Sequence, residues 1–530
     1  MSEEAGQGGA GRTEGTRFAG AALLLAASVL LSRALGFVRE MVLAYQLGTS
    51  TELDAYYAAF QIPDMLNHFL AGGALSIAFV PFYTRARSQQ GEDAAARLLA
   101  NVLGSMTVIA VLATLGMWWQ AEALVALQFP RFEPEIQALT VRLTRILLPA
   151  QIFFVAGGIL RAALMARGSF GTQALAPLIY NAGIIAGGGA FGSTLGPEGF
   201  AWGALAGAAI GPFLVPLWDA WRRRDVALGL RVAPWEREFL SYLVIAAPLM
   251  LGVSLLTVDE WYDKWFGALI SAGVVAQLGL ARRLMQLPVA VVGQAVATAA
   301  LPTLSKLWAD GRKPELDRIV QTTLQASLGL SLLAAAAFWA LAEPVVALVY
   351  QRGAFGADDT ANVARLLQIF SLAVPAWIVQ QIAVRPFFAR KDTWRPMLIG
   401  SAVALAAIPL YLALGKQYGA PGIAAAGVIG MTASAVVTLA FARWLHGAPA
   451  LGALLATAAR GAAIAALAGA AARAVLLVLA AESGPVLQLS LGGVAYLAVA
   501  AAALPLFGDA EMRAAVGRVA RLLTRSRSGE

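Results

Sequence analysis

Runs of about 20 apolar residues recur along almost the whole of this 530-residue chain. A helix of about 20 residues, rising 1.5 Å per residue, crosses roughly 30 Å of hydrocarbon. Because lipid offers no hydrogen-bond partner to open backbone groups, such spans must be helical. The pattern therefore predicts an all-α polytopic membrane protein with about 14 transmembrane helices. We place the spans at residues 18–47, 55–83, 97–119, 137–166, 173–191, 199–221, 238–266, 272–304, 318–342, 359–389, 396–415, 421–443, 455–480 and 486–507.

The distribution of charge supports this topology. Hydrophobic residues make up 59% of the chain and charged residues only 13%, which excludes an ordinary soluble domain. Lys and Arg alternate between loops, as the positive-inside rule requires, so the net charge of +8 reflects topology and not nucleic-acid binding. Both termini are expected in the cytoplasm. The loops assigned to the cytoplasm carry Arg85, Arg87, Arg222, Arg223, Arg224, Arg231, Lys306, Arg312, Lys313, Arg390, Lys391 and Arg395, against Arg131, Arg352 and Lys416 in the opposite loops.

An internal duplication organises the chain. The matching pairs are Ala121–Leu127 with Ala342–Leu348, Pro81 with Pro302, and residues 196–201 with 419–424, at offsets of 221, 221 and 223. Three matches in the same order indicate a true repeat. We predict two six-helix lobes in parallel orientation around a central cavity, plus two C-terminal helices, as in transporters built from repeats.

The predicted domain ranges follow from this repeat. They are a disordered cytoplasmic tail at 1–16, an N-lobe at 17–224, a C-lobe at 225–447, the last two spans at 448–508 and a basic cytoplasmic tail at 509–530. The last of these alternates apolar residues with arginines, which fits either a helix on an anionic leaflet or a solvated tail.

Arginines interrupt two of the apolar spans. Arg33 and Arg39 lie in the first span, and Arg282 and Arg283 lie in the eighth. An ionised side chain costs several kcal/mol inside a bilayer unless it faces water or a partner. A guanidinium stays protonated and can direct two hydrogen bonds at a phosphate. These residues therefore predict a membrane protein that handles something anionic, with the arginines of both lobes in one cavity.

Prolines interrupt four of the predicted spans. They are Pro63, Pro149, Pro288 and Pro375. A proline inside a helix removes a hydrogen bond and bends or breaks the helix. Such bends are useful for alternating access, although each one also serves ordinary packing.

Several motifs resemble the MurJ (MviN) lipid II flippases, a family of the multidrug/oligosaccharidyl-lipid/polysaccharide exporter superfamily. The motifs are Ser32-Arg-Ala-Leu-Gly-Phe-Val-Arg-Glu40, Asp54-Ala-Tyr-Tyr, Ile62-Pro-Asp-Met-Leu, Gly73-Ala-Leu-Ser-Ile-Ala-Phe-Val-Pro81, Ala281-Arg-Arg-Leu-Met-Gln-Leu-Pro288, Leu301-Pro-Thr-Leu-Ser-Lys306 and Gln351-Arg-Gly-Ala-Phe355. The likeness covers most of residues 18–445, and the motif around Arg33 and Arg39 is fairly specific to the family.

The resemblance implies export of the undecaprenyl-pyrophosphate-linked peptidoglycan precursor, lipid II, across a bacterial cytoplasmic membrane by alternating access. Arg39 and Arg283 match the family's essential cavity arginines, and Arg33 matches another important arginine nearby. Asp54 matches a family acid that would orient one of these arginines. The expected partners are lipid II or a related undecaprenyl-linked lipid and membrane lipids, with no cofactor and no nucleic acid, and the protein is expected to act as a monomer.

The chain also departs from the family pattern. Where members carry an arginine pair and a portal glutamate, this chain has Asn67-His68 and Gly72. His68 offers either a titratable cation or a neutral packing residue. Asp263 matches a proposed sodium ligand of the family, yet the eleventh span contains neither Asp nor Asn. The coupling ion, sodium or proton, is therefore left open. No metal site is assigned, and Asp263 is the one candidate ligand for such a site.

Acidic residues gather in the seventh span at Asp259, Glu260 and Asp263, next to Lys264. This spacing places carboxylates on one helical face. Our leading interpretation is that they pair with the cavity arginines, Arg33, Arg39 or Arg283, or with Lys264. The alternative is a proton- or cation-coupling site, with Arg282 in a supporting role.

Three functions compete at this stage. A lipid II flippase is favoured by the arginines and the resemblance. An exporter of another undecaprenyl-linked glycan shares the same pyrophosphate chemistry and would account for the departures at Asn67, His68 and Gly72. A cation-coupled drug exporter would instead favour acids and aromatic residues in its cavity. An enzyme is not expected, because the chain has two His, no Cys and no nucleophile or phosphate-loop motif.

Overall fold

The computed structural model describes residues 27–70, 74–223, 226, 228–251, 255–294, 303–390, 392, 394–479 and 483–517. Throughout these residues the regular structure is helical, as the sequence predicts. The chain forms two compact units, Met1–Gly252 and Val253–Glu530. Gly72, Arg224, Lys391, the predicted N-terminal tail and residues 518–530 lie outside the described part.

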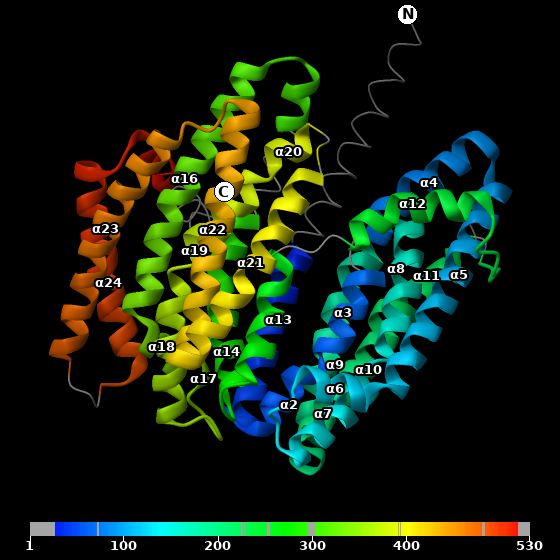
Figure 1. The fold of residues 1–530 in the computed structure, drawn as a ribbon, viewed down its shortest axis with the longest axis horizontal. Coiled ribbons are helices and arrows are strands. Elements are labelled where there is room, and N and C mark those ends of the chain that lie inside the picture. Colours follow the sequence, from blue (N-terminus) through cyan, green and yellow to red (C-terminus); the bar gives the residue numbers. More distant parts are fainter. Residues whose placement is uncertain are drawn as a thin grey trace, which may run out of the picture. The chain divides into compact units, whose positions relative to one another are not determined.

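Unit 1 begins with an unlabelled helix at residues 27–47 and continues with short and long helices (Figure 1). They are α2 (Thr51–Ala59), α3 (Gln61–Leu70), α4 (Ala74–Gln90), α5 (Glu92–Trp119), α6 (Ala121–Gln128), α7 (Pro134–Leu147), α8 (Ala150–Ala166), α9 (Gly171–Leu195), α10 (Pro197–Ala208), the π-helix η1 (Ala209–Leu214), α11 (Val215–Arg223) and α12 (Arg237–Leu251). Helix α8 packs against α4, α5 and η1, and α9 packs along α10.

Unit 2 includes unlabelled helices at residues 303–309 and 510–517. Its labelled helices are α13 (Leu255–Gly267), α14 (Val274–Pro288), the π-helix η2 (Val289–Gln294), α16 (Lys313–Ala340), α17 (Ala342–Tyr350), α18 (Ala357–Ser371), α19 (Val374–Ala383), α20 (Arg385–Ala389), α21 (Trp394–Tyr418), α22 (Ala420–His446), α23 (Leu451–Val478) and α24 (Pro485–Phe507). The last two helices pack on α16 and on each other. In the tail that follows, Met512 and Ala515 are buried on one face of helix 510–517.

Nine helices in the described part are long and apolar enough to cross a membrane, and the bent pair α18 and α19–α20 makes a tenth if it is one span. The protein is therefore a multi-pass membrane protein, while the count of fourteen stays a prediction. The seventh predicted span consists of α12, which packs on α3, α4 and α5, and α13, which packs on α14, α21 and α22. The two halves thus belong to different units, and the domain ranges predicted above stay predictions.

The prolines act on their helices as predicted. Pro149 stands between α7 and α8, and Pro375 opens α19 after a 40° bend from α18. Pro288 ends α14 where the backbone changes to the π-helix η2. Pro63 lies in the first turn of α3, just after α2 ends.

The structure confirms the internal duplication. Helices α5 and α16 have 28 residues each and begin 313 − 92 = 221 positions apart. The short helices α6 and α17 begin at the same offset, 342 − 121 = 221. Gly196 and Gly419 precede α10 and α22 with φ of 56° and 65°, a conformation that favours glycine. Helices α5 to α10 therefore recur in the same order as α16 to α22, with α23 and α24 added after the second copy.

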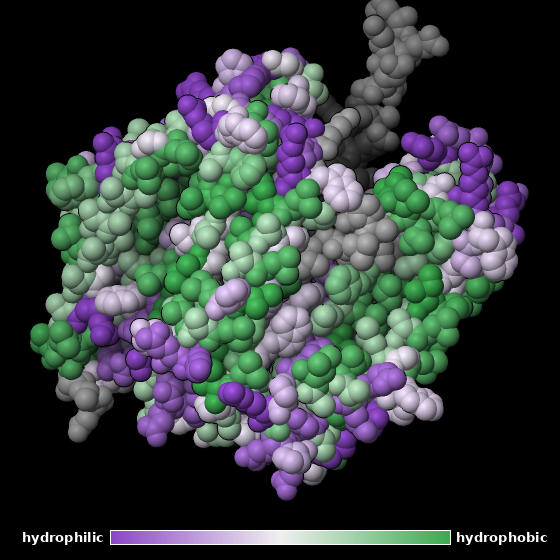
Figure 2. All heavy atoms as spheres, in the orientation of Figure 1, coloured by the Kyte–Doolittle hydropathy of each residue, from purple (hydrophilic) through white to green (hydrophobic). Residues whose placement is uncertain are grey.

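Large apolar side chains cover much of the outer surface. Exposed examples include Leu405 on α21, Trp444 on α22 and Val494 on α24. Figure 2 shows hydrophobic residues along the sides of the helices and hydrophilic residues near their ends. This distribution is that of helices solvated by lipid.

Candidate functional site

Arg39 is anchored in unit 1 by one carboxylate and one amide. Its Nη2 donates to Oε1 of Glu40 at 2.6 Å, and its Nη1 donates to Oδ1 of Asn181 on α9 at 3.1 Å. The Arg39 side chain keeps 19% of its surface exposed, whereas Glu40 is buried. The adjacent carboxylate on the same helix offsets part of the cost of placing an arginine in an apolar span.

Glu40 is itself fixed from a second helix. The hydroxyl of Tyr57 on α2 donates to Oε2 of Glu40 at 2.5 Å. The amide nitrogen of Asn181 donates to the carbonyl of Pro177, 3.0 Å away, which sets the orientation of the amide oxygen toward Arg39. Both partners of Arg39 are therefore held in place before any ligand arrives.

Arg33 lies on the same helix but on another face. Ser32, Gly36 and Arg39 form a stripe toward α9: Ser32 lies near the Asn181 amide at 3.5 Å, and a Cβ at Gly36 would be 3.8 Å from Asn181 Oδ1. Arg33 is offset from Ser32 by one residue, about 100° around the helix, and is exposed. The structure therefore separates the environments of Arg33 and Arg39.

The other predicted residues of unit 1 lie on α2 and α3. Asp54 is 1% exposed in the first turn of α2. Asn67 donates to the amide oxygen of Gln151 on α8 at 2.8 Å. His68 is partly buried, and its ring makes an edge contact with Phe69, with centroids 5.3 Å apart.

Unit 2 contains a fully buried arginine. Nη1 of Arg282, on α14, binds Oδ2 of Asp259, and its Nε and Nη2 lie 2.5 Å from Oδ2 of Asp263, both on α13. Tyr411 on α21 donates its hydroxyl to Oδ1 of Asp259. The guanidinium also stacks on Phe370 of α18, 4.7 Å from the ring centre.

This arrangement ties four helices together around one cation, and we name Asp259, Asp263, Arg282 and Tyr411 the Arg282 cluster. Arg282 and Asp259 are each 2% exposed. Our leading interpretation named Arg33, Arg39, Arg283 or Lys264 as partners of the acids. For Asp259 and Asp263 the bound partner in the structure is Arg282, because α14 turns that residue toward the buried face of α13 that carries both aspartates, whereas Arg283 meets Glu260 on a more exposed part of the same helix.

Arg283 has a more open environment. Its Nη2 donates to Oε1 of Glu260 at 3.2 Å, and the side chain is 32% exposed. Lys264 lies one turn along α13 from Glu260, 3.8 Å away, and is 8% exposed. The leading interpretation therefore describes Glu260 correctly.

A metal ion bound by Asp263 would have to compete with an arginine that already pairs with this carboxylate. The guanidinium of Arg282 occupies the space beside its carboxylate. Among the residues that the structure describes, no group of three His, Cys, Asp or Glu is arranged to hold a metal ion. Coupling to sodium or to protons through Asp263 stays a prediction.

The sequence analysis did not identify five contact residues as site residues: Glu40 and Tyr57, which it quoted only within motifs, and Asn181, Tyr411 and Phe370. Asn181 and Tyr411 carry a usable signal, since each is a polar side chain within an apolar span. Phe370 carries none, because an aromatic residue in such a span is ordinary core. Asn181 and Phe370 contact arginines 142 and 88 positions away, and Tyr411 contacts Asp259 across 152 positions, so all three contacts follow from helix packing alone.

Solved structures share this fold. A structure described as a lipid II flippase MurJ in an inward closed conformation matches with a TM-score of 0.76 at 21% identity, over 91% of this chain and 99% of that one. An inward-facing multidrug resistance MATE family transporter of the MOP superfamily matches with a TM-score of 0.67 at 16% identity, over 78% and 94%. The chain thus has the same fold as these two structures, and the two units and the internal duplication described above belong to that fold.

The sequence comparisons identify the family within this class. The model of the family described as lipid II flippase MurJ matches residues 43–491. A relative from Rhizobium meliloti (strain 1021), described as a probable lipid II flippase MurJ, is 29% identical over 426 residues, 79% of each chain. The chain belongs to the lipid II flippase MurJ family.

Proposed function

We propose that this protein moves lipid II from the inner to the outer leaflet of the bacterial cytoplasmic membrane by alternating access, with Arg39 and Arg283 binding the pyrophosphate. Family membership supports the substrate. The observation that carries the residue assignment is the partial exposure of these two arginines, set against the complete burial of Arg282.

Arg39 keeps donors for a ligand. A guanidinium has five N–H donors in a planar fork. Within the described residues, the contacts of Arg39 to Glu40 and Asn181 use two of them. The remaining donors lie on a side chain whose position is already set, which lowers the entropy cost of binding a phosphate.

Arg283 fits the same task from unit 2. Its partner Glu260 is 35% exposed and lies 3.2 Å away, so the pair is easily opened by a competing phosphate. Arg33 is an additional exposed cation on the Arg39 helix and would act on the same headgroup. Asp54 and His68 have supporting roles in this proposal, and the lipid tail stays in the bilayer throughout.

A second candidate is export of another undecaprenyl-linked glycan. The specific observation is Asn67, which forms a neutral amide pair with Gln151 where an arginine pair stands in the family pattern. A less cationic contact there would favour a headgroup with a different sugar or peptide. The pyrophosphate chemistry at Arg39 and Arg283 is the same for both candidates.

Complementation tests the proposal. Bacteria depleted of their own lipid II flippase would receive the wild-type chain, Arg39→Ala, Arg283→Ala, or the control Arg142→Ala. We expect the wild type and the control to restore growth and surface exposure of lipid II, and the two test variants to fail at normal membrane levels. Transport by Arg39→Ala and Arg283→Ala at the wild-type rate would refute their role. If the folded wild-type protein failed to restore growth, the result would favour another undecaprenyl-linked glycan as the substrate.

A further inference from the structure

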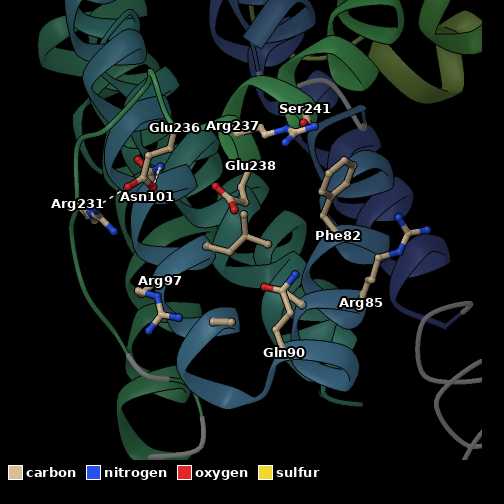
Figure 3. Close-up of a pocket in the computed structure, with 13 residues that line it drawn as sticks. Phe82, Arg85, Gln90, Arg97, Asn101, Arg231, Glu236, Arg237, Glu238 and Ser241 are labelled. Carbon is tan, nitrogen blue, oxygen red and sulfur yellow. Dashed lines mark hydrogen bonds and ion pairs between the residues drawn. The ribbon is translucent and has the colours of Figure 1, made fainter.

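A polar cavity lies at one end of unit 1, away from the arginines assigned above. It has a volume of about 570 Å³, within the usual range for small-ligand sites. Helices α4, α5 and α12 and the segment 228–236 surround it (Figure 3). Its charged and polar lining residues are Arg85, Gln90, Arg97, Asn101, Arg231, Glu236, Arg237, Glu238 and Ser241.

Three of the lining arginines are available to a ligand. Arg85, Arg97 and Arg237 come from three different helices, and within the described residues none of their guanidinium groups has an ion pair or a hydrogen bond. Arg231, in contrast, is paired with Glu236 at 2.5 Å. Glu238 lies between the labelled arginines in Figure 3 and is the one lining carboxylate left to oppose an anion. The lining has four Arg against two Glu, a net charge of 4 − 2 = +2.

The wall formed by segment 228–236 is built into the fold. Asn101 of α5 donates to the carbonyl of Ala233 at 3.0 Å and accepts from its N–H at 2.9 Å. The same amide donates to Glu236 at 2.9 Å. A Cβ at Gly104 would lie 2.2 Å from the carbonyl oxygen of Arg231, so only glycine allows this close approach. The cavity is therefore a fixed feature and not a gap beside a loose loop.

The surroundings indicate an amphipathic ligand. On α12, Leu240, Val244 and Ile245 are exposed at 47%, 72% and 52%, directly beyond Arg237 and Ser241. Figure 2 shows hydrophilic residues at this end of unit 1 and hydrophobic residues along its helices. A phosphate at the mouth of the cavity would leave room for acyl chains along α12. Basic pockets between helices on the cytoplasmic side are typical sites for lipid headgroups.

From these observations we propose that the cavity lined by Arg85, Arg97 and Arg237 binds a phosphate group at the membrane surface, supplied by the headgroup of an anionic lipid. The site is separate from the pyrophosphate role of Arg39 and does not depend on it. A bound lipid would hold α12 against α4 and α5. The end concerned is the one that the positive-inside rule assigns to the cytoplasm.

Arginine footprinting on the full-length wild type tests the proposal. The protein would be treated with phenylglyoxal in nanodiscs of phosphatidylglycerol, in nanodiscs of phosphatidylcholine, and in phosphatidylcholine with inorganic phosphate. We expect phosphatidylglycerol to slow modification of Arg85, Arg97 and Arg237 by about tenfold or more, with little effect on Arg87 and Arg222. Protection by inorganic phosphate but not by phosphatidylglycerol would support a phosphate site whose ligand is a soluble phosphate, and would overturn its assignment to a lipid. Equal protection of all five arginines, or of none, would overturn the proposal.

Charge-matched variants sharpen the test. The triple variant Arg85→Gln/Arg97→Gln/Arg237→Gln would be compared with Arg87→Gln/Arg222→Gln/Arg223→Gln, which loses the same charge outside the cavity lining. Retention of phosphatidylglycerol, measured by native mass spectrometry, should fall about tenfold or more in the first and stay near wild type in the second. Glu238→Gln should increase retention, because it removes the opposing carboxylate. A decrease in Glu238→Gln, or equal losses in both triples, would contradict a specific site.

Discussion

The two units place their arginines in opposite situations. In unit 1, Arg39 has one carboxylate and one amide as partners and remains 19% exposed. In unit 2, Arg282 has two carboxylates and an aromatic ring as partners and is 2% exposed. An ion pair closed from every side stabilises or specifies a fold, whereas one with an open side can exchange partners. The comparison suggests a rule that the variants below can test: we propose that enclosure, and not charge in a membrane span, separates a structural arginine such as Arg282 from a substrate-binding one such as Arg39.

Removing the enclosed arginine should have the largest effect on stability. Arg282→Met leaves Asp259 and Asp263 buried without their cation, which costs about 3–5 kcal/mol. The melting temperature of the purified protein in detergent measures the loss. The triple variant Asp259→Asn/Asp263→Asn/Arg282→Met removes the stranded charges and should recover most of the stability. If Arg282→Met were as stable as the wild type, the enclosed Arg282 would have no structural role, and the contrast with Arg39 would lose its basis.

The two tyrosines that hold the carboxylates form a matched pair. Tyr411→Phe and Tyr57→Phe each lose a hydrogen bond to a carboxylate, worth about 1.5–3 kcal/mol. Transport per folded molecule should fall in Tyr57→Phe only, since Tyr57 positions Glu40 beside Arg39. Tyr350→Phe is the control, because its bond to a neutral carbonyl is long, 3.5 Å. Equal transport by Tyr57→Phe and Tyr411→Phe would contradict the proposed difference between a substrate-binding Arg39 and a structural Arg282.

A methyl group added beside the Arg282 cluster tests how tightly it is packed. The Cβ of Gly427→Ala would lie 3.0 Å from the Tyr411 hydroxyl and 3.2 Å from Oδ1 of Asp259. We expect a loss of about 1–3 kcal/mol in the free energy of unfolding, typical of overpacking. Gly452→Ala meets nothing within 4 Å and should change stability by no more than about 1 kcal/mol, in the stabilising direction. The stabilities of Gly427→Ala and Gly452→Ala would be compared by thermal unfolding in the same detergent. Equal stability of the two variants would mean that the Arg282 cluster is loosely packed.

An exposed pair should show the smallest effect. Arg142 lies 3.0 Å from Glu198, but its side chain is 60% exposed. Arg142→Ala should change stability by less than about 1 kcal/mol and leave transport unchanged. Thermal unfolding and lipid II transport would both be measured. A loss as large as that of Arg282→Met would show that exposure does not rank these arginines.

Much of the architecture is predictable because it follows from local properties of the chain. Apolar run length gives the helices, and Pro149 and Pro375 interrupt them where their missing N–H groups demand it. The repeat is visible in short matches such as that of Ala121 with Ala342, because each copy must build the same helix starts.

The details of the candidate site are less predictable because they depend on rotation and packing. Arg282 and Arg283 are adjacent, so helical geometry separates them by about 100°. Nothing local decides which of them is enclosed by Asp259 and Asp263 and which pairs with the more exposed Glu260, so the helix packing sets their different environments. Asn181 contacts Arg39 across 142 positions, a distance in sequence that only helix packing bridges.

The most direct test of the account compares lipid II affinity with stability in purified Arg39→Gln, Arg283→Gln and Arg282→Met. The account predicts that the first two bind lipid II about tenfold or more weakly, the effect of losing one charge-assisted phosphate contact, with nearly wild-type melting temperatures. Arg282→Met should instead show a lowered melting temperature. Wild-type lipid II affinity in Arg39→Gln, or a loss of stability in it as large as in Arg282→Met, would contradict the account.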